Sequence, residues 1–161
     1  MISLLQIVIV GVIATLVLDA CALILKHGLR QTTTNWGMVG RWFAYLPRGV
    51  MVHDPISRTE PVAYEKAIGW FAHYAVGIVY AWLYLFLVSD IFLTQPTLAN
   101  AFVFGVLTVL APWFILQPGL GLGMFARKSP KPNVTRFTNL SMHAIFGLGI
   151  YMGWSVFTKF F

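Results

Sequence analysis

The sequence is poor in charged residues and nearly free of cysteine. Asp, Glu, Lys and Arg make up 10% of the 161 residues, whereas 58% are hydrophobic. A typical soluble domain carries about 25% charged and about 45–50% apolar residues. A chain of this length cannot bury so much apolar surface in one core, so the composition excludes a soluble domain and indicates an integral membrane protein. The single cysteine, Cys21, excludes an intrachain disulfide.

Long apolar runs dominate the rest of the sequence. A helix needs about 20 mostly apolar residues to cross the hydrocarbon core. Four windows reach this length, at about residues 2–25, 67–88, 98–120 and 137–157. Because backbone groups in lipid must be hydrogen-bonded internally, we predict helices. The expected fold is all-α and integral to the membrane: a four-transmembrane-helix bundle that forms a single domain over residues 1–161.

Lysine and arginine are almost confined to one side of the expected bundle. Ten of the eleven follow the first or third window: Lys26, Arg30, Arg41, Arg48, Arg58, Lys66, Arg127, Lys128, Lys131 and Arg136. The positive-inside rule therefore predicts two cytoplasmic loops and both termini outside. This topology accounts for the basic net charge, so we expect anionic lipid headgroups as partners and no nucleic acid.

The first basic segment contains an apolar stretch at about residues 36–50. Its apolar side chains recur at helical spacing, at Val39, Phe43, Leu46 and Val50, and it includes aromatic residues of the kind that favour the headgroup region. We predict an amphipathic helix in the cytoplasmic interface. Arg41 and Arg48 lie on another face and are candidate contacts for lipid headgroups.

Proline and glycine mark the limits and irregularities of the spans. Thr59-Glu60-Pro61 is typical of a helix start and predicts the beginning of the second span. Pro112 and Pro118 each remove a backbone donor, and glycines follow at positions 119, 121 and 123. The end of the third span is therefore expected to be kinked or partly unwound.

Polar residues recur at one depth of the expected bundle. Asp19, His73 and His143 each lie about 9 Å inside the cytoplasmic edge of a span, and Gln117 and Asn139 fall in the same zone. An ionisable residue within a span is a functional-site hypothesis by default. We therefore predict that these five side chains form a ligand-binding site inside the bundle.

Small residues stand four positions from several of these polar ones. The ladders include Gly11, Thr15, Gly69, Gly77 and Gly147. Small residues permit close helix packing in lipid, so we expect these faces to point inward. The spacing His-x-x-x-Gly occurs in the second and in the fourth span, so the two halves of the chain resemble weak copies of one helical hairpin. This similarity fits two parallel repeats, or it arises by chance because the sequence is so rich in apolar residues.

Several functions fit these residues. A carboxylate and two histidines can hold a small polar solute, an ion or a proton, which favours a function in binding or transport. Because four helices make a small transporter, we expect such a protein to act as a homodimer. Alternatively, His73 and His143 ligate a b-type haem, or bind a metal ion together with Asp19. A third interpretation is a structural or accessory subunit whose polar residues pair only with one another.

An enzyme acting on a lipid at the cytoplasmic interface is the remaining alternative. The parts would be a histidine base, Asp19 to orient it and an arginine on the phosphate. The sequence contains no nucleophile elbow, P-loop or H-E-x-x-H motif, so an enzyme is not the favoured interpretation.

Five pieces of the sequence carry a resemblance to a known family: Gly11–Asp19, Trp36–Arg41, Gly69–Tyr80, Gln117–Gly121 and His143–Tyr151. On these pieces nearly the whole chain resembles a family of small four-helix bacterial inner-membrane proteins of unknown function. The resemblance implies a location in a bacterial cytoplasmic membrane. It implies no activity, substrate or cofactor.

Overall fold

Helices form all the regular structure in residues 2–28 and 34–161, the part of the chain that the computed structural model describes. Four helical segments are long and apolar enough to cross a membrane: Leu4–Gly28, Glu65–Ile91, Leu98–Gly119 and Pro132–Phe160. The four predicted spans are therefore confirmed as helices. The last one begins at Pro132 rather than near Phe137.

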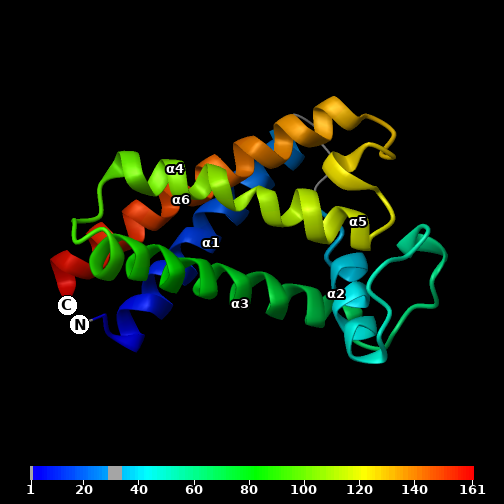
Figure 1. Ribbon diagram of the computed structural model, residues 1–161, viewed down its shortest axis with the longest axis horizontal. Coiled ribbons are helices and arrows are strands. Elements are labelled where there is room, and N and C mark those ends of the chain that lie inside the picture. The colour runs from blue at the N-terminus through cyan, green and yellow to red at the C-terminus, as the bar shows by residue number, and fades with distance from the viewer. Residues whose placement is uncertain (1, 29–33) are drawn as a thin grey trace. The chain divides into compact units, whose positions relative to one another are not determined.

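Some spans contain more than one kind of helix, and Figure 1 labels the α-helices. In chain order the elements are α1 (Leu4–Gly28), α2 (Trp36–Tyr45), η1 (Leu46–Arg48), η2 (Ile56–Arg58), α3 (Glu65–Phe86), η3 (Leu87–Ile91), α4 (Leu98–Thr108), η4 (Pro112–Leu116), α5 (Gln117–Gly119), η5 (Met124–Ala126) and α6 (Pro132–Phe160). The short elements η1, η2 and η5 are 3-10 turns, whereas η3 and η4 are π-helical.

The irregular end predicted for the third span is confirmed. Pro112 begins the π-helical turn η4, in which the Gln117 N–H bonds to the Pro112 carbonyl five residues back. A proline lacks the N–H that an α-helical turn would need at this point. Beyond α5, Gly121 and Gly123 have φ of 84° and 69°, a left-handed conformation that glycine adopts without strain.

The second span begins later than its sequence signal predicts, so the assignment of its start to Thr59-Glu60-Pro61 is wrong. The helix α3 starts at Glu65. The carbonyls of Ile56 and Thr59 instead accept hydrogen bonds from the Arg41 guanidinium. This stretch therefore folds as a loop around Arg41 rather than extending the helix.

The chain divides into two compact units, each built from separate segments. The first contains Met1–Thr33, Tyr74–Thr108 and Leu140–Phe161, and the second contains Thr34–His73 and Val109–Asn139. The predicted single domain stays a prediction. Arg30 lies outside the described residues.

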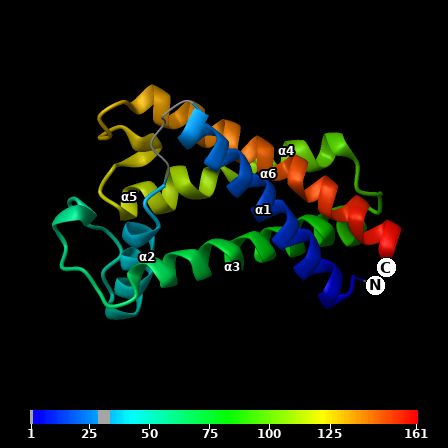
Figure 2. The ribbon, with the colours of Figure 1, turned by 180° about the vertical axis from the view of Figure 1, so that it is seen from behind.

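Close backbone contacts hold the helices of the first unit together. A Cβ at Gly11 would lie 2.6 Å from Ile78 Cα, and one at Gly149 would lie 2.8 Å from Ala14 Cα. Gly105 of α4 and Gly147 of α6 face each other in the same way. Small residues therefore point inward here, as predicted. The beginning of α1 and the end of α6 lie side by side in both views (Figures 1 and 2).

An apolar core fills the centre of the first unit. Its buried residues are Val10, Ala14, Ala81, Tyr84, Leu85, Val88, Ala101, Phe146 and Ile150. The one hydroxyl in this set is satisfied, because Tyr84 donates a hydrogen bond to Asn100 Oδ1 at 2.6 Å. Burial of a tyrosine with its hydroxyl paired contributes apolar contact without leaving an unmatched polar group.

In the second unit, α2 packs against the first turns of α3. Asn35 caps α2 by accepting hydrogen bonds from the backbone N–H groups of Gly37 and Met38. Gly40 and Gly69 lie at the contact, where added Cβ atoms would overlap the carbonyl oxygens of Glu65 and Trp36 respectively. The helix predicted over about residues 36–50 is thus confirmed as α2 and η1, and its place at a membrane surface stays a prediction.

Candidate functional site

Asp19 lies half-buried on α1, in the first unit. The Tyr74 hydroxyl, from α3, donates a hydrogen bond to Asp19 Oδ2 at 2.9 Å. The carboxylate is thereby held by a group from a neighbouring helix. Tyr74 was not among the predicted site residues, and its place directly after His73 was the only signal that could have drawn attention to it.

His143 lies half-buried on α6, also in the first unit. Its Nδ1 lies 2.7 Å from Thr108 Oγ1, and the Thr108 hydroxyl donates to the Gly105 carbonyl at 2.6 Å. A hydroxyl has one proton to donate, so both contacts are satisfied at once only in the tautomer in which the imidazole donates from Nδ1 to Thr108. In that tautomer the lone pair of the neutral ring lies on Nε2.

His73 belongs to the second unit, where tryptophans surround it. Its ring centroid lies 4.0 Å from that of Trp36 and 5.8 Å from that of Trp70. These contacts place one face of the imidazole against an indole contributed by α2. The structure thus places Asp19 and His143 in one unit and His73 in the other, and the convergence of the three stays a prediction.

Gln117 and Asn139 also belong to the second unit. Gln117 is only 4% exposed, and among the described residues its Oε1 has no hydrogen-bond partner. A buried amide oxygen without a donor is costly, so such an atom marks a place where a ligand or water fits. Asn139 is half-buried on α6. Their roles as binding residues stay predictions.

Arg41 organises the second unit from within. It is 7% exposed. Its Nε donates to Glu65 Oε2 at 2.8 Å and its Nη2 to Oε1 at 3.0 Å, while Nη1 donates to the Ile56 and Thr59 carbonyls. The predicted contact of Arg41 with a lipid headgroup would require this pair with Glu65 to open. Arg48, by contrast, is exposed, and its guanidinium lies 4.8 Å from the centre of the Tyr45 ring.

Two pKa values in the second unit are shifted by the contacts of Arg41 and by burial. Hydrogen bonds to Glu65 raise the pKa of Arg41 above its usual value. Burial, and then the charge of Arg41, lower the pKa of His53 below 6.5. His53 is 6% exposed, with Nδ1 2.8 Å from Thr59 Oγ1 and no hydrogen-bond partner for Nε2 among the described residues.

The metal alternative receives no support from the described residues. No group of three or more His, Cys, Asp or Glu side chains in residues 2–28 and 34–161 is placed to hold a metal ion. A metal ion coordinated jointly by Asp19, His73 and His143 is therefore not proposed further, whereas their prediction as ligand-binding residues stays a prediction. The b-type haem alternative stays a prediction, which a visible absorption spectrum of the purified protein would test.

Comparison with family models matches residues 8–157 to a family described as "Protein of unknown function (DUF2938)". The chain belongs to this family. The family of unknown function expected from the sequence pieces is thus confirmed. All five candidate binding residues lie inside the DUF2938 match: Asp19, His73, Gln117, Asn139 and His143. Neither the comparison with curated proteins nor that with solved structures gives a match.

Proposed function

We propose that this DUF2938 chain is a multi-pass protein of a bacterial inner membrane that binds a proton or another small cation within the bilayer and carries it across. Both termini would lie outside. The binding groups would be the Asp19 carboxylate and His143 Nε2, with His73, Gln117 and Asn139 as further candidates. We also propose a homodimer, which light scattering of the detergent-solubilised protein would measure.

One observation carries the proposal: His143 Nδ1 is held by the buried Thr108 hydroxyl, which also contacts the Gly105 carbonyl. The tautomer that satisfies both contacts has its proton on Nδ1 and its lone pair on Nε2. A fixed tautomer is how proteins prepare a histidine for proton or cation binding. Thr108 is buried and His143 half-buried in helices long enough to cross a membrane.

The free-energy cost of placing ionisable side chains within a membrane span supports a functional role for Asp19 and His143. Insertion scales put a charged side chain at the centre of a span at about 2.5–3.5 kcal/mol. Asp19 keeps a carboxylate in this setting, held by the Tyr74 hydroxyl. Intramembrane aspartates and histidines are typical of proton relays in transporters.

Flux through the purified protein tests the proposal. The protein is reconstituted in liposomes that contain a pH-sensitive dye, and a potassium diffusion potential is applied with valinomycin. We expect proton flux above that of protein-free vesicles, falling to that background in His143→Gln and Asp19→Asn. The exposed His27 supplies the matched control, because His27→Gln should retain the wild-type flux.

Separate vesicles without ionophore, loaded with a sodium or a potassium indicator, test the other small cations. The proposal is overturned if the wild-type protein moves neither protons, sodium nor potassium faster than empty vesicles leak. It is equally overturned if Asp19→Asn and His143→Gln leave the flux unchanged.

A structural or accessory role is the second candidate, favoured by the close glycine contacts of the first unit. Gly105 and Gly147 bring α4 and α6 together beside the Thr108–His143 pair. In this case the polar residues only fix the helix packing. His143→Gln would then lower the melting temperature, whereas no variant and no wild-type preparation would conduct any of the three cations.

A further inference from the structure

A polar pocket and an apolar groove share a wall in the second unit. The pocket has a volume of about 330 Å³, and its lining includes Val52, Asp54, Pro118, Gly123, Arg127 and Lys128. The groove has a volume of about 350 Å³, and its lining includes Trp42, Met51, Val52, Ile115, Pro118 and Gly119. Val52 and Pro118 line both, so the two spaces are contiguous.

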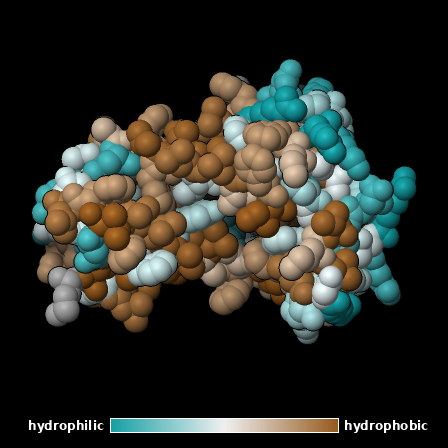
Figure 3. Space-filling view, viewed as in Figure 1, coloured by the Kyte–Doolittle hydropathy of each residue, from teal (hydrophilic) through white to brown (hydrophobic). Residues whose placement is uncertain are grey.

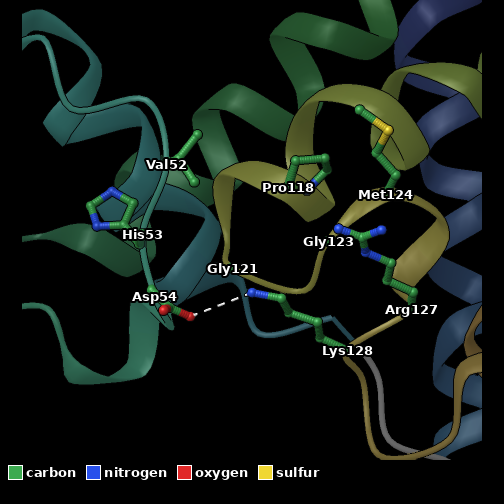
Figure 4. Close-up of a pocket in the computed structure, with 9 residues that line it drawn as sticks. All are labelled: Val52, His53, Asp54, Pro118, Gly121, Gly123, Met124, Arg127 and Lys128. Carbon is green, nitrogen blue, oxygen red and sulfur yellow. Dashed lines mark ion pairs between the residues drawn. The ribbon is translucent and has the colours of Figure 1, made fainter.

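Two cationic side chains line the pocket, and the described residues provide only one weak ion pair for them. Arg127 and Lys128 extend into it from the segment after α5 (Figure 4). Lys128 Nζ lies 3.8 Å from Asp54 Oδ1, and both side chains are more than half exposed. Such surface pairs are weak, so an anion can displace the carboxylate. Among the described residues, no carboxylate forms a salt bridge with Arg127.

Gly123 places Arg127 over the pocket. Its φ of 69° suits glycine, and a Cβ at this position would lie 2.9 Å from Arg127 Cγ and 3.1 Å from Arg127 Nε. The arginine therefore folds back along the glycine backbone, in space that any other residue would fill. In Figure 4 the Arg127 side chain folds back toward Gly123 and Met124, and the residue remains exposed.

Several apolar side chains that line the groove are exposed. Met51 and Val52 on one side are 67% and 66% exposed, and Ile115 on the other is 60% exposed. Trp42 forms the floor: its indole N–H donates to the Met51 carbonyl at 2.9 Å. A Cβ at Gly119 would overlap the same indole, so the floor needs glycine there.

Backbone hydrogen bonds hold the pocket and groove in shape. His53 N–H donates to the Gly119 carbonyl at 3.0 Å, and Ile56 N–H donates to the Leu120 carbonyl at 3.1 Å. These bonds join two segments that are far apart in the sequence. A binding surface built on such a framework needs little reorganisation to take a ligand.

We propose that the pocket and the groove together bind one anionic phospholipid, with its phosphate on Arg127 and Lys128 and one acyl chain in the groove. The charge of the second unit favours an anion, because it contains eight Lys and Arg against three Asp and Glu. Figure 3 shows hydrophilic side chains gathered around its loops.

The apolar groove and the cationic pocket follow each other along the third span in the order in which a phospholipid places its acyl chains and its phosphate. The groove runs along η4, within the segment Leu98–Gly119 that is apolar enough to cross a membrane, whereas the cationic pocket lies just beyond the end of that segment. A phospholipid has the same order, with hydrocarbon inside and phosphate outside. This site is independent of the cation path proposed above, since it shares none of its residues.

Native mass spectrometry of the purified protein tests the proposal. The protein is titrated with phosphatidylglycerol or with phosphatidylcholine of the same chain length, and the fraction that carries one lipid gives an apparent Kd. We expect a one-to-one complex with phosphatidylglycerol, weakened about thirty-fold in the double variant Arg127→Gln/Lys128→Gln. The control Arg58→Gln/Lys131→Gln removes two cations of the same unit outside the pocket, and should change Kd less than about twofold.

A second variant separates a lipid from a free anion. Ile115→Trp fills the groove without touching the pocket, so it should weaken the lipid complex while leaving the melting temperature near that of the wild type. The proposal is overturned if inorganic phosphate competes fully with the lipid and Ile115→Trp has no effect, which would indicate a free-phosphate site. It is also overturned by equal affinity for both lipids, by equal losses in the two double variants, or by a lipid-free dimer that Ile115→Trp dissociates.

Discussion

At the scale of single residues, Arg41 determines how the second unit folds. Its guanidinium binds both oxygens of Glu65 and two loop carbonyls, so one side chain joins α2, the loop after it and the start of α3. A planar fork of donors suits this bidentate role better than a lysine ammonium does. Neutralising the carboxylate would leave a buried charge with half its partners.

Glu65→Gln should therefore destabilise the protein by about 3 kcal/mol, the low end for breaking a buried pair, because the carboxylate is partly exposed. The matched control is Glu60→Gln, five residues earlier and exposed, which should stay within about 0.5 kcal/mol. Thermal unfolding in one detergent measures both. Equal losses in the two variants would mean that the pair does not organise the loop.

His53 should make stability depend on pH. Burial and the Arg41 charge lower its pKa in the folded protein below 6.5, so between the two pKa values the unfolded chain binds more protons. Stability is therefore full above pH 6.5 and is lost as the pH falls through the folded-state pKa. His53→Asn should unfold with a smaller change in melting temperature between pH 7.5 and pH 5 than the wild type. An unchanged pH dependence would contradict the assignment.

Residue partners were the least predictable part of the candidate site. Counting residues along apolar windows found Asp19 and His143, because depth in a membrane depends on position in a helix. The same counting could not find Thr108 or Tyr74, since a hydroxyl on another helix leaves no periodic signal. Arg41 was noticed for its charge, and only its distant partner Glu65 makes it a buried structural group.

At the scale of elements, two glycines decide how closely α2 packs on α3. Gly69→Ala would drive a methyl group into the Trp36 carbonyl, where backbone on both sides prevents relaxation. We expect a loss of about 3 kcal/mol or more, the upper range for overpacking. Gly28→Ala is the control, because among the described residues no atom outside its own helix backbone and chain neighbours lies within 4 Å of its added Cβ. Similar melting temperatures for the two variants would rule out the tight contact.

The sequence predicted the elements well where one physical requirement acts alone. Length and hydropathy are enough for a span, and helical spacing of apolar residues is enough for α2. The start of α3 was missed because the Thr59 carbonyl accepts a hydrogen bond from Arg41 instead of beginning a helix at this position. The sequence of residues 59–61 alone cannot reveal a hydrogen-bond donor, such as Arg41, that lies in another element.

At the scale of the whole molecule, the distribution of cations predicts the topology. In a background with Cys21→Ser, single cysteines at Ser57 and Thr94 should react with an impermeant thiol reagent from opposite sides of the membrane. Ser57 should be reached only from the cytoplasm, because ten of the eleven cations are predicted on that side. Reaction of both positions from the same side would refute the four-span topology.

The π-helical turn η4 gives a single residue unusual influence over the remainder of the third span. An α-helix turns by about 100° per residue, so the extra residue of a π turn rotates all later side chains by that angle. Deleting one residue between Thr108 and Gln117 would leave the hydropathy of the span nearly unchanged. It would nevertheless turn Gly119 away from Trp42 and replace the wall that the third span contributes to the groove with another face. Among homologues, a length difference of one residue here would thus separate chains that retain the lipid groove from chains that have lost it.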